Sequence, residues 1–239
     1  MKSSFIKTFN KNKPYIALTA PHAHCLDVNY RTCDLKAKIA IIYISEILTK
    51  LKLNFINHIN VTLRGKREND MNRFQSRSTE YRKKLSKYIK DFDVIFNLDI
   101  HSYWQNDKHI FYIIDGTGYP CLYCVDFIKS MSNGLNLEFT DDIIKYGPHS
   151  CSKRFKTFKE AYDKCDYTND IQDEFREQGI DSILIEFKES LSKKKIKEIC
   201  KHVCYWIYKK YSGNDVTIDI YKKIFGDKNY KKYFKLYSS

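Results

Sequence analysis

Short apolar runs alternate with amphipathic stretches along the chain, and this alternation predicts an α/β fold. Strands are indicated where apolar or β-branched residues stand together between polar loops. We predict strands at residues 15–20, 53–63, 93–99, 109–115 and 180–187. Helices are indicated where apolar residues recur every three or four positions. We predict them from Thr32 or Asp34 to residue 51 and at residues 78–90, 122–131, 169–178 and 190–211.

The order of these segments predicts the architecture. Strands that alternate with helices form parallel sheets with helices on both faces. We therefore expect a single domain over residues 1–239, built on a mixed, mostly parallel sheet. Residues 1–14 form a polar N-terminal segment and residues 212–239 a basic C-terminal extension. Pro21 is expected to end the first strand, and Gly179 to follow the end of a helix.

The composition is that of a folded protein without a membrane segment. Hydrophobic residues make up 43% of the chain, which is ample for a buried core. No apolar run approaches the roughly 20 residues that a membrane span needs. Residues 1–14 lack the apolar region of a secretory signal. We expect a soluble, intracellular and cytoplasmic protein.

The eight cysteines show no regular disulfide framework. Cys121 and Cys124 form one CxxC pair, whereas a structural zinc site needs a second pair. Cys200 and Cys204 are separated by three residues in a predicted helix. We interpret the cysteines as reduced, partly buried thiols.

The formal net charge of +13 leaves two interpretations open. An excess of positive charge attracts nucleic acid, anionic membranes or acidic substrates. The lysines are nevertheless spread over the whole chain, with modest concentrations at residues 193–197 and 222–235. We favour an ordinary solvated surface and keep a nucleic-acid-binding or polyanion-binding module as the rival hypothesis.

Residues that can bind a metal follow the ends of the predicted strands. His22 follows the first strand, Asp34 opens the next helix, His101 ends the central strand and Glu186 closes the last one. In open α/β sheets, such positions meet at the carboxyl edge. Two imidazoles and a carboxylate make a catalytic zinc site with a fourth position for water, and a further carboxylate can accept the proton of that water. We predict one zinc per chain, bound by His22, His101 and one carboxylate.

Five short motifs in this order resemble a known family. They are Pro21-His22-Ala23, Asp34, Asp70-Met71-Asn72-Arg73, Asp99-Ile100-His101-Ser102 and Ile185-Glu186-Phe187. The series is similar to the N-formylglutamate amidohydrolase family, which belongs with the zinc carboxypeptidase and aspartoacylase-like hydrolases. The resemblance implies a zinc carboxypeptidase-like (phosphorylase/hydrolase-like) fold. It also implies that Glu186 is the general base, which deprotonates the zinc-bound water and later protonates the leaving amine.

The acidic metal ligand has two candidates under this resemblance. The family places an aspartate at the head of the first helix, which corresponds to Asp34. The wider carboxypeptidase pattern has a carboxylate three residues after the first histidine, and His24 with Asp27 fits that spacing. We prefer His22 with Asp34 and keep the second pair as the alternative.

The resemblance also implies a substrate that bears a carboxylate. Asn72 and Arg73 would bind it, because a planar guanidinium beside an amide donor matches its two oxygens. A second arginine polarises the scissile carbonyl in these relatives. Arg64 and Arg67 both lie in the same loop, and the choice between them stays open.

These observations predict a metal-dependent amidohydrolase or carboxypeptidase-like hydrolase. It would use a metal-activated water to cleave an amide bond of an N-acyl amino acid or of a peptide C-terminus. The alternatives are a zinc deacylase or esterase that acts on another acyl group, and the polyanion-binding module with a decayed site. Residues 115–167 match no part of the family, so the acyl group stays open, as does the oligomeric state.

Overall fold

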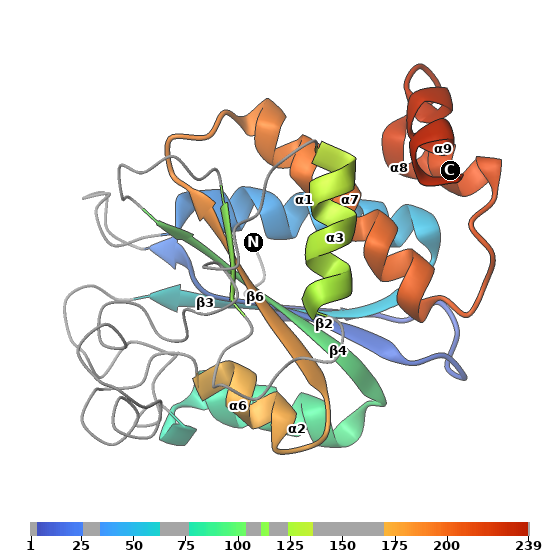
Figure 1. The fold of residues 1–239 in the computed structure, drawn as a ribbon. Helices are drawn as coiled ribbons and strands as arrows, with labels where there is room; N and C mark the ends of the chain where they lie inside the picture. Colours follow the sequence, from blue (N-terminus) through green and yellow to red (C-terminus); the bar gives the residue numbers. More distant parts are fainter. Residues whose placement is uncertain are drawn as a thin grey trace.

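A six-stranded sheet forms the centre of the computed structural model (Figure 1). The structure describes residues 4–25, 34–62, 77–103, 111–114, 124–135 and 170–238. The strands are β1 (Ser4–Lys7), β2 (Tyr15–Cys25), β3 (Asn54–Thr62), β4 (Val94–Tyr103), β5 (Phe111–Ile114) and β6 (Asp181–Lys188). They lie in the order β1-β3-β2-β4-β6-β5. The four inner strands are parallel and both edge strands are antiparallel, which confirms the predicted mixed, mostly parallel sheet.

Helices cover both faces of this sheet, as predicted (Figure 1). One face carries α1 (Leu35–Leu51), α3 (Cys124–Leu135) and α7 (Lys193–Tyr211), and the other carries α2 (Glu80–Asp91) and α6 (Asp170–Arg176). The chain ends in α8 (Ile218–Phe225) and α9 (Tyr230–Ser238). No helix in the described ranges is both long and apolar enough to span a bilayer.

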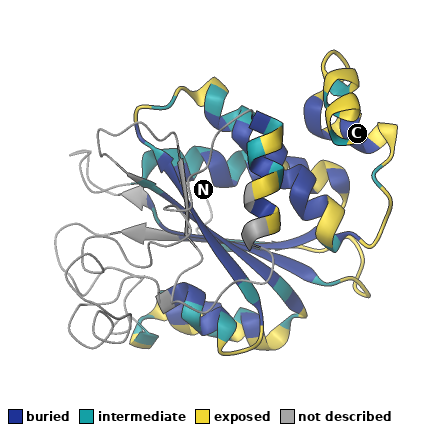
Figure 2. Ribbon diagram, viewed as in Figure 1, coloured by how far each residue is buried: buried dark blue, intermediate teal, exposed yellow. Residues whose placement is uncertain are grey.

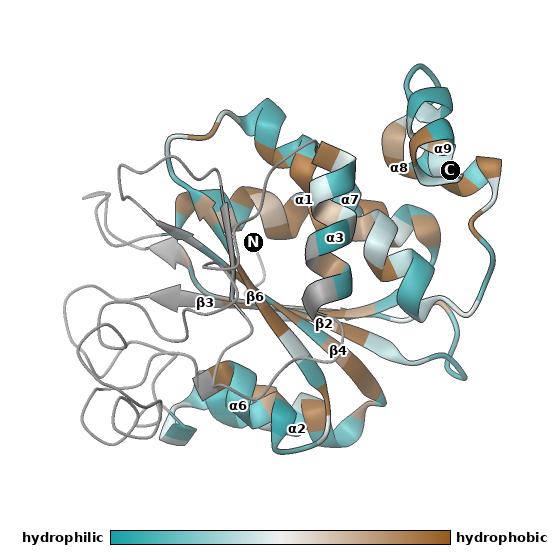
Figure 3. Ribbon diagram, viewed as in Figure 1, coloured by the Kyte–Doolittle hydropathy of each residue, from teal (hydrophilic) through white to brown (hydrophobic). Residues whose placement is uncertain are grey.

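The core consists of two apolar layers, one on each side of the sheet. The strands are buried along most of their length (Figure 2), and their hydrophobic residues stand out against the hydrophilic outer surfaces of α2 and α6 (Figure 3). The larger layer joins the sheet to α1, α3, α7 and α8. The smaller one joins it to α2 and α6. Burial on both faces explains the continuous apolar runs of the parallel strands.

Helix ends follow local chemistry. The Thr79 side chain accepts a hydrogen bond from the Arg82 amide at the start of α2, and Ser192 does the same for Lys195 at the start of α7. Gly179 has a φ of +73° after α6, a conformation that glycine adopts without strain. The predicted end of this helix at Gly179 is therefore confirmed. Cys200 and Cys204 are buried free thiols, as predicted.

The prediction that Pro21 ends the first strand was wrong, because β2 continues to Cys25. The register between β2 and β3 shifts between Ala20 and His24, and Pro21 lies inside this irregularity. A proline has no amide hydrogen, so it is tolerated where the regular ladder is interrupted. His22 consequently lies within β2 rather than after it, and His101 lies within β4, which continues to Tyr103.

Three further elements were not predicted. The polar segment 1–14 contains β1, whose Phe5 packs edge-on against Phe55 with 5.8 Å between ring centroids. The basic extension 212–239 contains α8 and α9, and α8 buries Ile220 and Ile224 in the larger core layer. High lysine content concealed the apolar side of α8.

Candidate active site

The carboxyl ends of three neighbouring strands bring the predicted residues together. His22 lies on β2, His101 on β4 and Glu186 on β6. His101 and Glu186 are partners in the parallel register, so both side chains project from the same face of the sheet. Asp34 comes from the start of α1, and its backbone amide donates to the carbonyl of His22 over 3.1 Å.

His101 is the centre of this arrangement. Its Nδ1 lies 3.0 Å from Asp34 Oδ2, and its Nε2 donates to Asp99 Oδ2 over 3.2 Å. The Thr19 hydroxyl donates to the other oxygen of Asp99 over 2.7 Å, which fixes that carboxylate. The rings of His22 and His101 are 5.3 Å apart between centroids. His101 is thus held between two carboxylates with a second imidazole beside it.

The electrostatics of His101 favour a positive charge at this point. Burial lowers the pKa of the imidazole, but the charges of Asp99 and Asp34 and their hydrogen bonds outweigh burial. The net result is a pKa well above the usual value of histidine. An environment that stabilises a proton on the ring also suits a cation between the ring and Asp34.

The donor set fits a divalent cation in its chemistry. Imidazole nitrogen and carboxylate oxygen are the ligands of catalytic zinc sites, at about 2.0–2.2 Å from the metal. Two atoms that share one such ion lie about 3 Å apart, close to the 3.0 Å between His101 Nδ1 and Asp34 Oδ2. Within the described ranges, no set of three or more His, Cys, Asp or Glu side chains has the full arrangement of a metal site. The structure therefore shows an ion pair between His101 and Asp34, with the His22 ring adjacent to it.

At the start of α1, Glu189 rather than Asp34 accepts a hydrogen bond from the helix backbone, and the Asp34 side chain contacts His101. Asp34 occupies the N-cap position, but its side chain forms no cap hydrogen bond within the described part of the chain. Instead, Glu189 accepts from the Lys36 amide over 3.2 Å. The Ser102 hydroxyl donates to the same Glu189 oxygen. Burial raises the pKa of Glu189, although both hydrogen bonds oppose this shift.

Sequence analysis missed Glu189 and assigned no role to Asp99. Glu189 lies in the turn after β6, and nothing in the local pattern connects it to the start of α1, far away in sequence. Asp99 did carry a signal. It lies two residues before His101 on the same strand, so the two side chains share a face.

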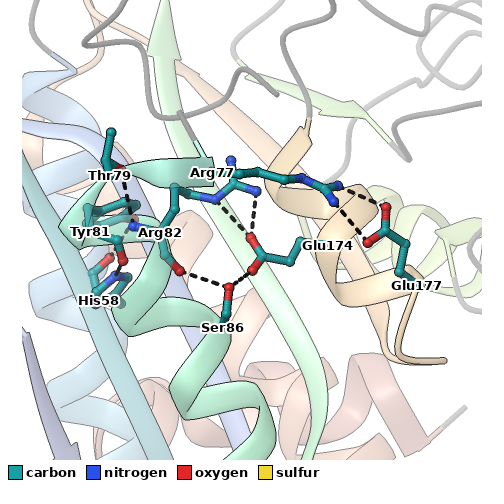
Figure 4. Close-up of polar contacts among 8 residues, drawn as sticks. All are labelled: His58, Arg77, Thr79, Tyr81, Arg82, Ser86, Glu174 and Glu177. Carbon is teal, nitrogen blue, oxygen red and sulfur yellow. Dashed lines mark hydrogen bonds and ion pairs between the residues drawn. The ribbon is translucent and has the colours of Figure 1, made fainter. Parts of the chain in front are cut away.

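Polar contacts between α2 and α6 support the sheet beneath the site (Figure 4). Arg82 is fully buried and donates to Glu174 through Nε over 2.9 Å and Nη2 over 2.6 Å. Ser86 donates to the other oxygen of Glu174. Arg77 forms a two-pronged pair with Glu177 at 2.9 Å and 3.1 Å.

The predicted substrate-binding residues lie outside the described residues. These are Arg64, Arg67, Asn72 and Arg73, together with the alternative ligand Asp27 and most of residues 115–167. Their roles stay predictions.

Comparisons with known proteins identify the fold. The chain is similar to a Burkholderia mallei structure described as a candidate carboxypeptidase, with a TM-score of 0.53 and 9% identity over 88% of this chain and 60% of that one. It is also similar to a candidate carboxypeptidase A from Shewanella denitrificans, with a TM-score of 0.51 and 11% identity over 83% of this chain and 57% of that one. No protein-family model and no curated protein matches the sequence.

These likenesses define a class by fold alone. The chain is an α/β protein with the fold of these carboxypeptidase-like structures, as the resemblance implied. It spans less than two thirds of the length of either structure. Membership in the N-formylglutamate amidohydrolase family stays a prediction.

Proposed function

We propose that this chain is a metal-dependent hydrolase of amide bonds. The observation that carries the proposal is the 3.0 Å approach of His101 Nδ1 and Asp34 Oδ2, with His22 and Glu186 at the same edge of the sheet. The fold shared with candidate carboxypeptidases supports it.

His22, Asp34 and His101 would hold the ion, and their nitrogen and oxygen donors favour zinc. When bound, such an ion supplies Lewis acidity, which polarises a carbonyl and acidifies water. Asp99 positions His101. A neutral ring that donates from Nε2 to Asp99 would keep its lone pair on Nδ1, the atom 3.0 Å from Asp34. The alternative pair, His24 with Asp27, remains part of the hypothesis to be tested.

Glu186 would be the general base. Glu186 is 7% exposed, and its side chain projects from the same face of the sheet as that of His101. A carboxylate in this place would accept a proton from the attacking water and deliver it to the leaving amine. Among the described carboxylates near the site, Asp34 and Asp99 contact His101, and Glu189 accepts hydrogen bonds from Ser102 and from the Lys36 amide. We therefore assign proton transfer to Glu186.

The proposed substrate is an N-acyl amino acid or a peptide with a free C-terminal carboxylate. Arg73 and Asn72 would bind that carboxylate, and Arg64 or Arg67 would polarise the scissile carbonyl. The formal net charge of +13 supports an anionic substrate, because a positive field draws anions toward the protein.

Metal analysis of purified protein tests the proposal. Wild type should hold about one zinc per chain, and His101→Gln should hold almost none. His58→Gln is the matched control. His58 is also a buried strand histidine with a partner on each nitrogen, Ser4 Oγ at 2.7 Å and the Tyr81 carbonyl at 3.0 Å. Full zinc in a folded His101→Gln variant would refute the proposed site.

The same measurement decides between the two acidic ligands. If Asp34 is the ligand, Asp34→Asn should lose zinc while Asp27→Asn retains it. The reverse result would assign the metal to His24 and Asp27.

A further inference from the structure

A second concave region lies between α1, α7 and α8, away from the candidate active site. The groove has a volume of about 570 Å³. Its floor includes Ile47, Ile224 and Phe225, which are almost completely buried. Lys50, at the end of α1, is on its rim, whereas Asp34 precedes the start of that helix. About 24 Å of helix separates the two positions, so the groove is a separate site.

The rim of the groove carries an excess of positive charge. Four lysines and two aspartates line it: Lys50, Lys201, Lys222, Lys223, Asp219 and Asp227. Lys223 pairs with Asp219 over 2.6 Å, which neutralises one charge of each sign. The remaining excess suits a dianion better than a long polyanion, because a nucleic-acid strand needs a continuous basic surface.

Lys201 is the most informative of these lysines. Its ammonium lies 3.5 Å from the carbonyl of Phe225, and the side chain is partly buried. Burial lowers its pKa, and the nearby charges of Lys197 and Lys50 lower it further, against the opposing effect of Glu198. Like charges held together in a half-buried position are stabilised when an anion binds between them.

The groove also offers an apolar surface beside these charges. Tyr43 is half-buried on the wall, and the Lys197 ammonium lies 4.9 Å from the centre of its ring. Burial raises the pKa of the Tyr43 hydroxyl, which stays a hydrogen-bond donor at neutral pH. Pockets for small molecules measure about 300–1,000 Å³ and combine an apolar lining with a few polar groups. The groove has a volume within this range, and its lining is mainly polar and charged, with Tyr43 as the half-buried aromatic side chain on its wall.

We propose that this groove binds a small organic phosphate monoester. Lys50 and Lys201 contact the phosphate, and the half-buried Tyr43 contacts the organic group. Because α8 forms one wall, the basic C-terminal extension builds the site.

Titration calorimetry at constant ionic strength tests the proposal, with phenyl phosphate and inorganic phosphate as ligands. Wild type should bind phenyl phosphate with a Kd of about 1 mM or lower, and more tightly than inorganic phosphate. Lys50→Gln should weaken phenyl phosphate binding about three- to tenfold, and a Lys50→Gln/Lys201→Gln variant should weaken it further. Lys50 is exposed, so its replacement leaves the fold intact.

Lys87→Gln is the matched control, because Lys87 is equally exposed but lies on α2, across the sheet. This variant removes the same charge and should change the Kd by less than about twofold, because salt screens the interaction between a distant exposed charge and the ligand. Equal weakening by Lys50→Gln and Lys87→Gln would assign the binding to net charge and overturn the proposal. Wild type that binds single-stranded RNA but shows no phenyl phosphate binding at about 10 mM would also overturn it.

Discussion

His101 shows how neighbouring carboxylates can fix the position of a single side chain. A carboxylate lies at each of its ring nitrogens, at 3.0 Å and 3.2 Å, and each comes from a different element. Asp99 shares the strand with His101, so its position follows from the pleat. Asp34 is available only because Glu189 binds the Lys36 amide at the start of α1. The substitution Glu189→Ala would therefore affect His101 through Asp34 without contacting it.

Replacement of Glu186 tests proton transfer without removing the metal. Glutamine keeps the shape of the side chain but cannot accept a proton, so Glu186→Gln should fold and retain zinc. Loss of a general base lowers the rate by about 10²–10⁴-fold. Glu177→Gln is the control, because Glu177 is an exposed glutamate bound to Arg77 on the surface. A Glu186→Gln enzyme with normal turnover would place the base elsewhere.

Replacement of Arg73 tests whether the enzyme recognises a carboxylate on its substrate. If Arg73 binds it, wild type should prefer a substrate with a free carboxylate over the corresponding amide. Arg73→Ala should lower kcat/KM for the free acid about 10- to 150-fold, the effect of one charge-assisted contact. Arg73→Lys should recover only part of this loss in kcat/KM, since an ammonium group lacks the planar, two-pronged geometry of a guanidinium. Equal efficiency on acid and amide in wild type would favour deacylation of an uncharged substrate.

His58 should make the stability of the protein depend on pH. Burial lowers its pKa to about 4, against the opposing hydrogen bond to Tyr81. In the unfolded chain the pKa is about 6.5, so between pH 6.5 and 4 the unfolded state binds more protons. The free energy of unfolding should therefore fall by about 2 kcal/mol from this residue between pH 7 and pH 5.

Denaturant titrations of wild type and His58→Gln at both pH values measure this contribution. The pH dependence should be smaller in the variant by about 2 kcal/mol. An identical pH dependence in the two proteins would show that the pKa of His58 is the same in the folded and unfolded states.

At the scale of elements, the contact between α2 and α6 depends on a buried ion pair. Arg82→Met alone leaves Glu174 largely buried without its guanidinium, which should lower the free energy of unfolding by about 3–5 kcal/mol. Arg82→Met/Glu174→Met removes both charges and should cost clearly less than the single variant. Thermal denaturation of the three proteins measures the difference. A double variant less stable than Arg82→Met would indicate that the pair itself is strongly stabilising.

The parallel strands could be predicted because both faces of the sheet are covered, which gives these strands long, uninterrupted apolar runs. The helices that cover the sheet could be predicted because their apolar residues recur every three or four positions. The continuation of β2 past Pro21 could not be predicted, because it depends on a register shift against β3. The edge strand β1 was missed because only Phe5 and Ile6 are apolar in it. In the candidate site, His22, Asp34, His101 and Glu186 could be placed at one edge of the sheet. Glu189 could not, because its contact with α1 is a long-range one.

On the scale of the whole molecule, the C-terminal extension belongs to the main core. Four residues of α8 are buried there: Ile220, Tyr221, Ile224 and Phe225. Each fully buried apolar side chain contributes about 1.5–3 kcal/mol, so their loss approaches the total stability of a typical domain, about 5–15 kcal/mol. A chain that ends at Asn214 should be unfolded or unfold at a much lower temperature.

Truncation after Asn229 is the matched control, because it removes only α9, which buries no residue completely. Its melting temperature should lie between those of wild type and the chain that ends at Asn214. Equal melting temperatures for wild type and the chain ending at Asn214 would show that α8 contributes nothing to the core.

The order of strands in the sheet has a consequence for the folding rate. β2 pairs with β4, so Tyr15 and Val94 must meet, and β4 pairs with β6, so Phe96 must meet Asp181. Each pairing closes a long stretch of chain, and chains dominated by such distant contacts fold slowly. Strand edges and apolar surface stay exposed during that time, which favours aggregation at high protein concentration. Because His22, His101 and Glu186 belong to these three strands, the site can form only after both pairings are complete.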